Sequence, residues 1–315
     1  MTIQKETFTC PAAGGDILHG IWWLPEGEPR GLVQLVHGMA EHIDRYDPLA
    51  RYLAERGYAV VGHDQAGHGE SAPLKGYLGP RQGWQHLIQD IDNLRSKAQS
   101  RFPQAAYFLM GHSMGTFLVR CYLLQGRANP AGVLRPIAGV MLSGTGMQPM
   151  GLLRLGSFLA GAHCLLGGEK KPAWLLHAMS FGAYNGRYRK EGPMSWLSTD
   201  PESVAAYTAS PLCGFPFTGG GYRDLFQGLK MLHDTAGYAR IPKELPILLF
   251  SGDGDPVGDY GKAPVAVAEL LKAHGIQQVT VKIYPGERHE TLNGKQRSLV
   301  MDDLSAWMEG IIASK

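Results

Sequence analysis

The sequence lacks the features that would assign its 315 residues to a metal-binding or nucleic-acid-binding class. Its four cysteines are far apart and include no C-x-x-C pair, so we expect no zinc site, no other metal and no cofactor. Their spacing fits a reducing compartment. The formal net charge is only +2 and no basic run exceeds three residues, so the charge pattern does not indicate nucleic-acid binding.

Long apolar runs and targeting signals are also lacking. No stretch reaches the roughly eighteen uninterrupted apolar residues that a membrane span needs. Residues 1–6 do not have the apolar segment of a signal peptide, and neither end carries a lipidation motif. We therefore expect a soluble, cytoplasmic protein, and the sequence leaves its oligomeric state open.

Strands and helices alternate along most of the chain. Apolar, partly β-branched runs predict strands, and apolar residues at helical spacing predict helices. The predicted strands cover residues 32–36, 58–61, 107–110, 137–142, 246–251 and 279–284, and the predicted helices 49–56, 84–94, 263–274 and 299–312. The first of these helices should be capped by Asp47 and stopped by Gly57. Strands joined by helices imply an α/β fold with a mostly parallel sheet and helices on both faces.

Residues 147–240 interrupt this alternation. They are rich in glycine, proline and aromatic residues, show no clear strands, and begin with an apolar run, 152–166, that predicts a helix. An insertion at this place predicts a mainly helical cap, 147–240, over a core of residues 1–146 and 241–315. The cap has nine lysines and arginines against six aspartates and glutamates. We ascribe this excess to solvated surface charge, and a transient contact of the cap with a membrane or micelle surface stays open.

The segment Gly111-His112-Ser113-Met114-Gly115 lies between a predicted strand and a predicted helix. A serine on such a sharp turn is held in a strained backbone conformation with its hydroxyl exposed, and the glycines let strand and helix pass closely. The pattern predicts Ser113 as a nucleophile. A glycine-rich turn without any chemistry is the alternative.

A serine hydroxyl needs a base, and the base needs a carboxylate that orients it. The expected chain order is serine, acid, histidine. Among the 12 histidines, His289 has the right order and follows a predicted strand. Asp253 and Asp255 both follow the strand at 246–251, and their spacing alone does not separate them.

Two backbone N–H groups are needed to stabilise the negative charge that develops on a carbonyl oxygen. One belongs to Met114, the residue after the nucleophile. The other is expected in the loop His37-Gly38-Met39-Ala40, which follows the strand at 32–36, and Met39 would donate it. An ordinary strand-ending turn is the alternative for this loop.

Taken together, these motifs resemble a known family. The segments His37–His42, Arg45-Tyr46 and Asp64–Ser71, followed by the turn at Ser113, look like the monoglyceride lipase and lysophospholipase group of α/β hydrolases, to which serine aminopeptidases are related. The resemblance covers most of residues 30–145 and 245–315. It implies the α/β-hydrolase fold. It also implies that the acid is the last residue of Gly252-Asp253-Gly254-Asp255, and it agrees with Ser113, His289, Met39 and Met114. Residues 147–240 do not match well enough to transfer a binding residue.

The leading hypothesis is a serine carboxylester hydrolase that acts on aliphatic acyl esters, such as monoacylglycerols, lysophospholipids or medium-chain esters. Small-molecule esters or lipids would be its partners. In the cap, the aromatic residues Trp174 and Phe217 are candidate substrate contacts, with simple packing as the alternative.

Two other functions stay open. A serine aminopeptidase would need acidic groups to hold a substrate ammonium, and the candidates are Glu41, Glu191, Glu202 and Asp224. A non-catalytic hydrolase-like receptor is the third hypothesis, and turnover of a generic ester would exclude it.

Overall fold

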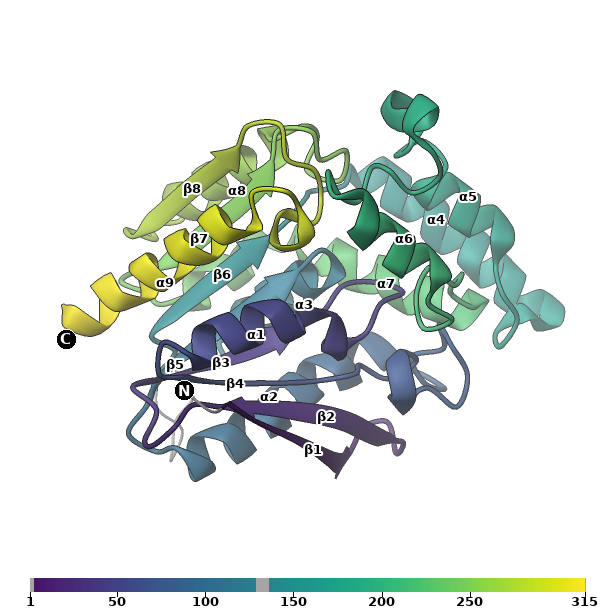
Figure 1. Ribbon diagram of the computed structural model, residues 1–315. Helices are drawn as coiled ribbons and strands as arrows, with labels where there is room; N and C mark the ends of the chain where they lie inside the picture. The colour runs from purple at the N-terminus through teal and green to yellow at the C-terminus, as the bar shows by residue number, and fades with distance from the viewer. Residues whose placement is uncertain (1–2, 129–135, 315) are drawn as a thin grey trace.

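An eight-stranded sheet runs through the residues that the computed structural model describes, 3–128 and 136–314. Its spatial order is β1-β2-β4-β3-β5-β6-β7-β8 (Figure 1). The pairs β1/β2 and β2/β4 are antiparallel and the remaining pairs are parallel. The strands are β1 (Gln4–Pro11), β2 (Ile17–Leu24), β3 (Gly31–Val36), β4 (Tyr58–His63), β5 (Ala106–His112), β6 (Gly139–Ser143), β7 (Ile247–Gly252) and β8 (Val279–Tyr284).

Helices cover both faces of the sheet, as the sequence predicts. They are α1 (Asp47–Ala54), α2 (Gly83–Arg101), α3 (Met114–Leu124), α4 (Met150–His163), α5 (Trp174–Phe181), α6 (Pro201–Ala209), α7 (Gly219–Met231), α8 (Lys262–Ala273) and α9 (Arg297–Ala313). Apolar residues of α1 and α9 pack in one core cluster, and those of α2, α3 and α8 pack in another. Every residue of β3, β4, β6 and β7 is buried, which explains their continuous apolar runs.

The predicted strands and helices are found, with shifted ends. Helix α1 begins at Asp47, so the prediction that Asp47 caps it is wrong. The Asp47 carboxylate instead accepts hydrogen bonds from the side chains of Trp23 and Arg51. The β1/β2 hairpin was not predicted. The exposed, alternating β1 lies at the edge of the sheet, where a weak apolar signal is expected.

Between β6 and β7, the chain forms the helices α4 to α7. Figure 1 shows them gathered beside one end of the sheet. Helix α7 packs on α2 and α3 of the core as well as on α4, so the boundaries 147 and 240 of a separate cap stay a prediction. Below, "cap" means residues 147–240.

One helical stretch of the cap is more apolar than we expected. Met150–Gly168, which joins α4 to a short helical turn η3 (Cys164–Gly168), is the one helix of the described residues that is long and apolar enough to cross a membrane. Its mean hydropathy is 1.3, and only 17% of it is buried. Length and composition alone are weak grounds for a span, and the chain kinks at Gly167, where φ is 80°.

Candidate active site

Ser113 lies on the sharp turn between β5 and α3. Its φ of 50° and ψ of −118° are unusual for a residue with a side chain. A Cβ on Gly111 would lie 2.5 Å from the carbonyl oxygen of Gly115, and a Cβ on Gly115 would overlap the carbonyl oxygen of Val36. Strand and helix can therefore pass this closely only because both flanking residues are glycines.

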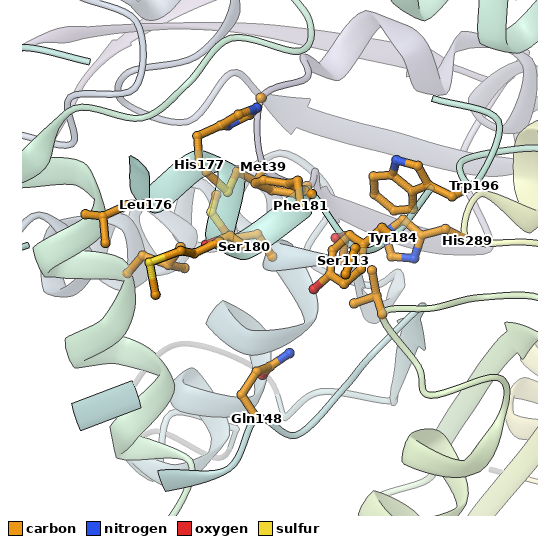
Figure 2. Close-up of a pocket in the computed structure, with 18 of the residues that line it drawn as sticks. Met39, Ser113, Gln148, Leu176, His177, Ser180, Phe181, Tyr184, Trp196 and His289 are labelled. Atoms are coloured by element: carbon orange, nitrogen blue, oxygen red, sulfur yellow. The ribbon is translucent and has the colours of Figure 1, made fainter. Parts of the chain in front are cut away.

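His289, in the loop after β8, contacts Asp255, in the loop after β7. The two side chains are buried, and His289 Nδ1 lies 3.0 Å from Asp255 Oδ1. The carboxylate also accepts hydrogen bonds from Ser251 Oγ and Val257 N, each over 2.8 Å. With the Nδ1 proton directed at this carboxylate, Nε2 is the nitrogen left to accept a proton. Ser113 and His289 line the same cavity (Figure 2).

The two candidate acids, which the sequence alone could not separate, have different surroundings. Asp253 is exposed, and its Oδ1 accepts a hydrogen bond from Gly286 N over 2.7 Å. This is the backbone-capping role that aspartate commonly has in turns. Asp255, the residue that the resemblance implied, is the one that contacts the imidazole.

Burial and charge shift the pKa values of Asp255 and His289 in opposite directions. Burial alone would raise the pKa of the Asp255 carboxyl, but His289 and the three hydrogen bonds lower it below its ordinary value. Burial alone would lower the pKa of the His289 imidazole, but the Asp255 carboxylate raises it above its ordinary value. The arrangement therefore stabilises a protonated imidazole beside Ser113.

The loop after β3 carries the predicted N–H donor Met39. His37 Nδ1 lies 2.8 Å from the carbonyl oxygen of Gly38, and Gln65 N donates to His37 Nε2 over 2.9 Å. These two contacts assign the Nδ1–H tautomer to His37. The Gly38 carbonyl and the Met39 N–H belong to one trans peptide and point in opposite directions, so His37 fixes the direction of that N–H. Met39 and Met114 both line the cavity.

A buried charged network supports the same loop. Glu41 accepts a hydrogen bond from Gly38 N over 2.5 Å and one from Tyr46 Oη over 2.9 Å. Arg45 donates a hydrogen bond to Glu41 and forms a bidentate ion pair with Glu290, in which the two N–O distances are 2.7 and 2.8 Å. Burial alone would raise the pKa values of both carboxyls, but Arg45 lowers them. The network joins the Met39 loop to the residue after His289.

Sequence reasoning gave no role to Arg45, Glu290 or His112. The four-residue spacing of Glu41 and Arg45 was the available signal for Arg45, although Glu41 precedes the short helical turn that begins at Ile43. The ring centroid of His112 lies 4.8 Å from that of His289. Burial lowers the pKa of His112 to about 4, so this imidazole is neutral at physiological pH.

The cavity beside Ser113 has a volume of about 610 Å³. Its walls come from the loop after β3, from α3 and from the cap, and Figure 2 shows Leu176, His177, Ser180 and Phe181 of α5 around it. Most of the lining is apolar, with a few polar groups, as in binding sites for apolar small molecules. The apolar side chains of the lining also include Phe117, Leu153, Leu225, Phe226 and Leu229.

Neither of the cap residues predicted to contact substrate lines this cavity. Trp174, at the start of α5, is 65% exposed and faces solvent. Phe217 is fully buried, and its ring packs against those of His68 and Tyr222. Composition indicated that the cap is rich in aromatic residues, but it did not indicate which rings point into the cavity, into the core or toward solvent. The structure therefore places both residues outside the cavity lining, and their contact with substrate stays a prediction, whereas Leu176 and Phe181 of the same region do face the cavity.

Among the described residues, no group of three or more histidine, cysteine, aspartate or glutamate side chains is placed to hold a metal ion.

Comparison with known proteins supports the family resemblance that the sequence motifs suggested. The family described as serine aminopeptidase, S33, matches residues 27–296. The monoacylglycerol lipase of Mycolicibacterium smegmatis is 29% identical over 293 residues, which cover 91% of this chain and 90% of that protein.

The human monoglyceride lipase is 29% identical over 280 residues, covering 88% of this chain and 81% of its own length. The structure of a thermostable carboxyl esterase from Bacillus coagulans, in complex with glycerol, superimposes with a TM-score of 0.85 at 27% identity. It covers 99% of this chain and 100% of its own. These findings confirm the α/β-hydrolase fold and a serine hydrolase similar to monoacylglycerol lipases. The chain belongs to the serine aminopeptidase, S33, family.

Proposed function

We propose that this hydrolase cleaves aliphatic acyl esters through an acyl-enzyme intermediate on Ser113. The observation that carries the proposal is the buried His289–Asp255 pair beside Ser113, at a largely apolar cavity of about 610 Å³. Monoacylglycerols are the first substrate class to test, because the relatives named above are monoacylglycerol lipases. Lysophospholipids and medium-chain esters are the others.

In the proposed reaction, Ser113 Oγ attacks the ester carbonyl carbon while His289 Nε2 takes the hydroxyl proton. The Met39 and Met114 N–H groups bind the oxygen that becomes negatively charged. When the C–O bond to the alcohol breaks, His289 returns the proton to the leaving oxygen. Water then attacks the acyl group by the same route and releases the acid. Asp255 holds the Nδ1–H tautomer and stabilises the imidazolium that forms twice in each cycle.

A peptidase function has weaker support from the candidate acids. Glu41 lines the cavity, but Gly38 N, Tyr46 Oη and Arg45 already occupy its oxygens. Asp224 is bonded to Gly83 N and Arg223, away from the cavity. Glu191 and Glu202 are exposed and do not line it either. Glu290 also lines the cavity, and it too is bonded to Arg45, so a substrate ammonium would have to displace Arg45 from Glu41 or Glu290.

One hydrolysis panel tests the proposal. It contains aryl esters of increasing chain length, a monoacylglycerol, a lysophospholipid and an aminoacyl amide, each assayed with wild-type protein and Ser113→Ala. We expect ester turnover that Ser113→Ala reduces at least about a thousandfold in a folded protein, because members of such a unit act together. Faster turnover of the amide would establish the peptidase, and absence of all turnover in a folded wild-type protein would leave a receptor.

We also propose that the cap rests on a lipid–water interface while the substrate is taken up. Its two neighbouring segments α4–η3 and α5 present exposed apolar side chains: Leu152, Leu155, Phe158, Leu165, Leu166, Trp174, Leu175 and Met179. Exposed lysines and arginines, including Arg154, Lys170 and Lys171, accompany them and would attract anionic lipid. Apolar side chains beside basic residues are typical of surfaces that bind bilayers without spanning them.

Sedimentation with vesicles tests this contact. Wild-type protein should bind phosphatidylglycerol-containing vesicles more than pure phosphatidylcholine vesicles, and Leu165→Ser with Leu166→Ser should weaken both. The matched control is Leu299→Ser, which changes an exposed leucine on α9, outside the cap. Equal binding by the control and the cap variant would refute the proposed surface.

A further inference from the structure

The cap is hydrogen-bonded to the two loops that carry the candidate catalytic groups. The carbonyl oxygen of Ala40, next to Met39, accepts hydrogen bonds from Gly214 N over 2.9 Å and from Tyr207 Oη over 3.1 Å. On the other side, Glu290 N donates to the carbonyl oxygen of Leu197 over 2.7 Å. Tyr207 lies on α6, and all three cap partners come from residues 197–214.

The carbonyl that Tyr207 holds belongs to a strained residue. Ala40 has a φ of 53°, in the left-handed region, which is disfavoured for a residue with a Cβ. Such a conformation persists only where its surroundings hold it. The turn that Ala40 completes brings Glu41 back onto Gly38 N, with Met39 in the middle. Relaxation of Ala40 would therefore weaken the bond from Gly38 N to Glu41 and loosen the turn that positions the Met39 N–H, which His37 holds only from the other side.

The ring of Tyr207 has a second contact with the same machinery. The side chain is buried, and its ring centroid lies 4.8 Å from the guanidinium carbon of Arg45. That guanidinium bridges Glu41 and Glu290. The ring thus packs on the network that joins the two loops, while its hydroxyl holds the Ala40 carbonyl.

We propose that Tyr207 is a positioning residue for ester hydrolysis: it holds the Ala40 turn so that the Met39 N–H faces the developing oxyanion. The inference rests on the proposed function, in which Met39 donates to that oxygen. It makes α6 a fixed part of the reaction centre, although α6 belongs to the region between β6 and β7.

Tyr207→Phe is the test, because it keeps the ring on Arg45 and removes only the hydroxyl. Both acylation and deacylation pass through an oxyanion, so kcat should fall about three- to tenfold whichever step limits the rate, with KM little changed. The affinity for an alkylboronic acid, which forms a tetrahedral adduct on the serine, should fall by a similar factor. Tyr207→Met, which keeps a buried apolar side chain but removes both the hydroxyl and the ring on Arg45, replaces Tyr207→Phe if the latter does not fold, and should lower kcat and boronic acid affinity at least as much.

Tyr238→Phe is the matched control. Tyr238 is also buried, and its hydroxyl donates to the carbonyl oxygen of Leu232 over 3.0 Å, outside the cavity lining. We expect this control to lose thermal stability without a change in kcat or boronic acid affinity. Unchanged kcat in a folded Tyr207→Phe, or a loss confined to KM, would overturn the inference. If wild-type protein hydrolyses esters and Ser113→Ala does not, such a result leaves the proposed function intact.

Discussion

Replacing Asp255 with asparagine removes one charge and leaves the shape of the site. In the structure, Asp255 Oδ1 accepts hydrogen bonds from both His289 Nδ1 and Val257 N, and Oδ2 accepts one from Ser251 Oγ. The Val257 N–H can only donate, so the amide oxygen of the variant must take the Oδ1 position. The amide NH₂ then faces Ser251, whose hydroxyl can accept. The correct His289 tautomer is therefore preserved, and the loss is one of charge.

This charge is worth most when His289 is protonated. Two unit charges about 4 Å apart attract each other by about 4 kcal/mol at an effective dielectric constant near 20. Only the imidazolium of the transition state feels this attraction, so kcat/KM should fall by roughly 10³. A flipped amide that stabilised the wrong tautomer would cost more, about 10⁴.

The pH dependence of kcat/KM provides the second readout. Activity needs a neutral His289, so it declines as the pH falls through the pKa of that imidazole. Asp255 raises this pKa, so Asp255→Asn should move the acidic limb of the profile to lower pH.

Asp253→Asn is the control, because an amide oxygen can still accept the hydrogen bond from Gly286 N, and its kcat/KM should stay within about twofold. Equal losses in the two variants, or an unmoved acidic limb in Asp255→Asn, would refute the assignment.

Three further predictions concern the cavity and the core. For esters of increasing chain length, kcat/KM should rise about two- to fourfold per methylene and then drop where the cavity ends; a flat profile would indicate an open cleft. Phe217→Ala should lower the free energy of unfolding by about 3 to 5 kcal/mol without moving the chain-length optimum, whereas Trp174→Ala should change neither. Thermal unfolding measures the first quantity, and the ester series measures the second. Burial raises the pKa of Asp90 to about 6, so its ionisation destabilises the folded protein as the pH rises from 4 to 8. The unfolding temperature of Asp90→Asn relative to wild type should therefore increase over that range, and parallel curves would contradict this.

The predictions that agree with the structure rest on short stretches of sequence. The conformation of Ser113 follows from the two glycines that flank it, within five residues. The position of His289 follows from the strand directly before it. Asp253 and Asp255 show the limit of such reasoning, since both follow β7 at almost the same place. What separates them is burial and the direction of the carboxylate, and these depend on how the loops after β7 and β8 pack together.

The contacts that join the cap to the reaction centre connect residues far apart in the sequence. Tyr207 is 167 residues from Ala40, and Glu290 is 245 residues from Arg45. These partners meet because the strand order places β3 beside β5 and brings the loops after β3 and β8 to the same cavity. No periodicity or spacing specifies which tyrosine of the cap reaches the Ala40 carbonyl. The local traces of this network are the short spacings that separate Glu41 from Gly38, Arg45 and Tyr46. The spacing of Glu41 and Arg45 indicates an ion pair, and only the fold makes that pair part of the loop that carries Met39.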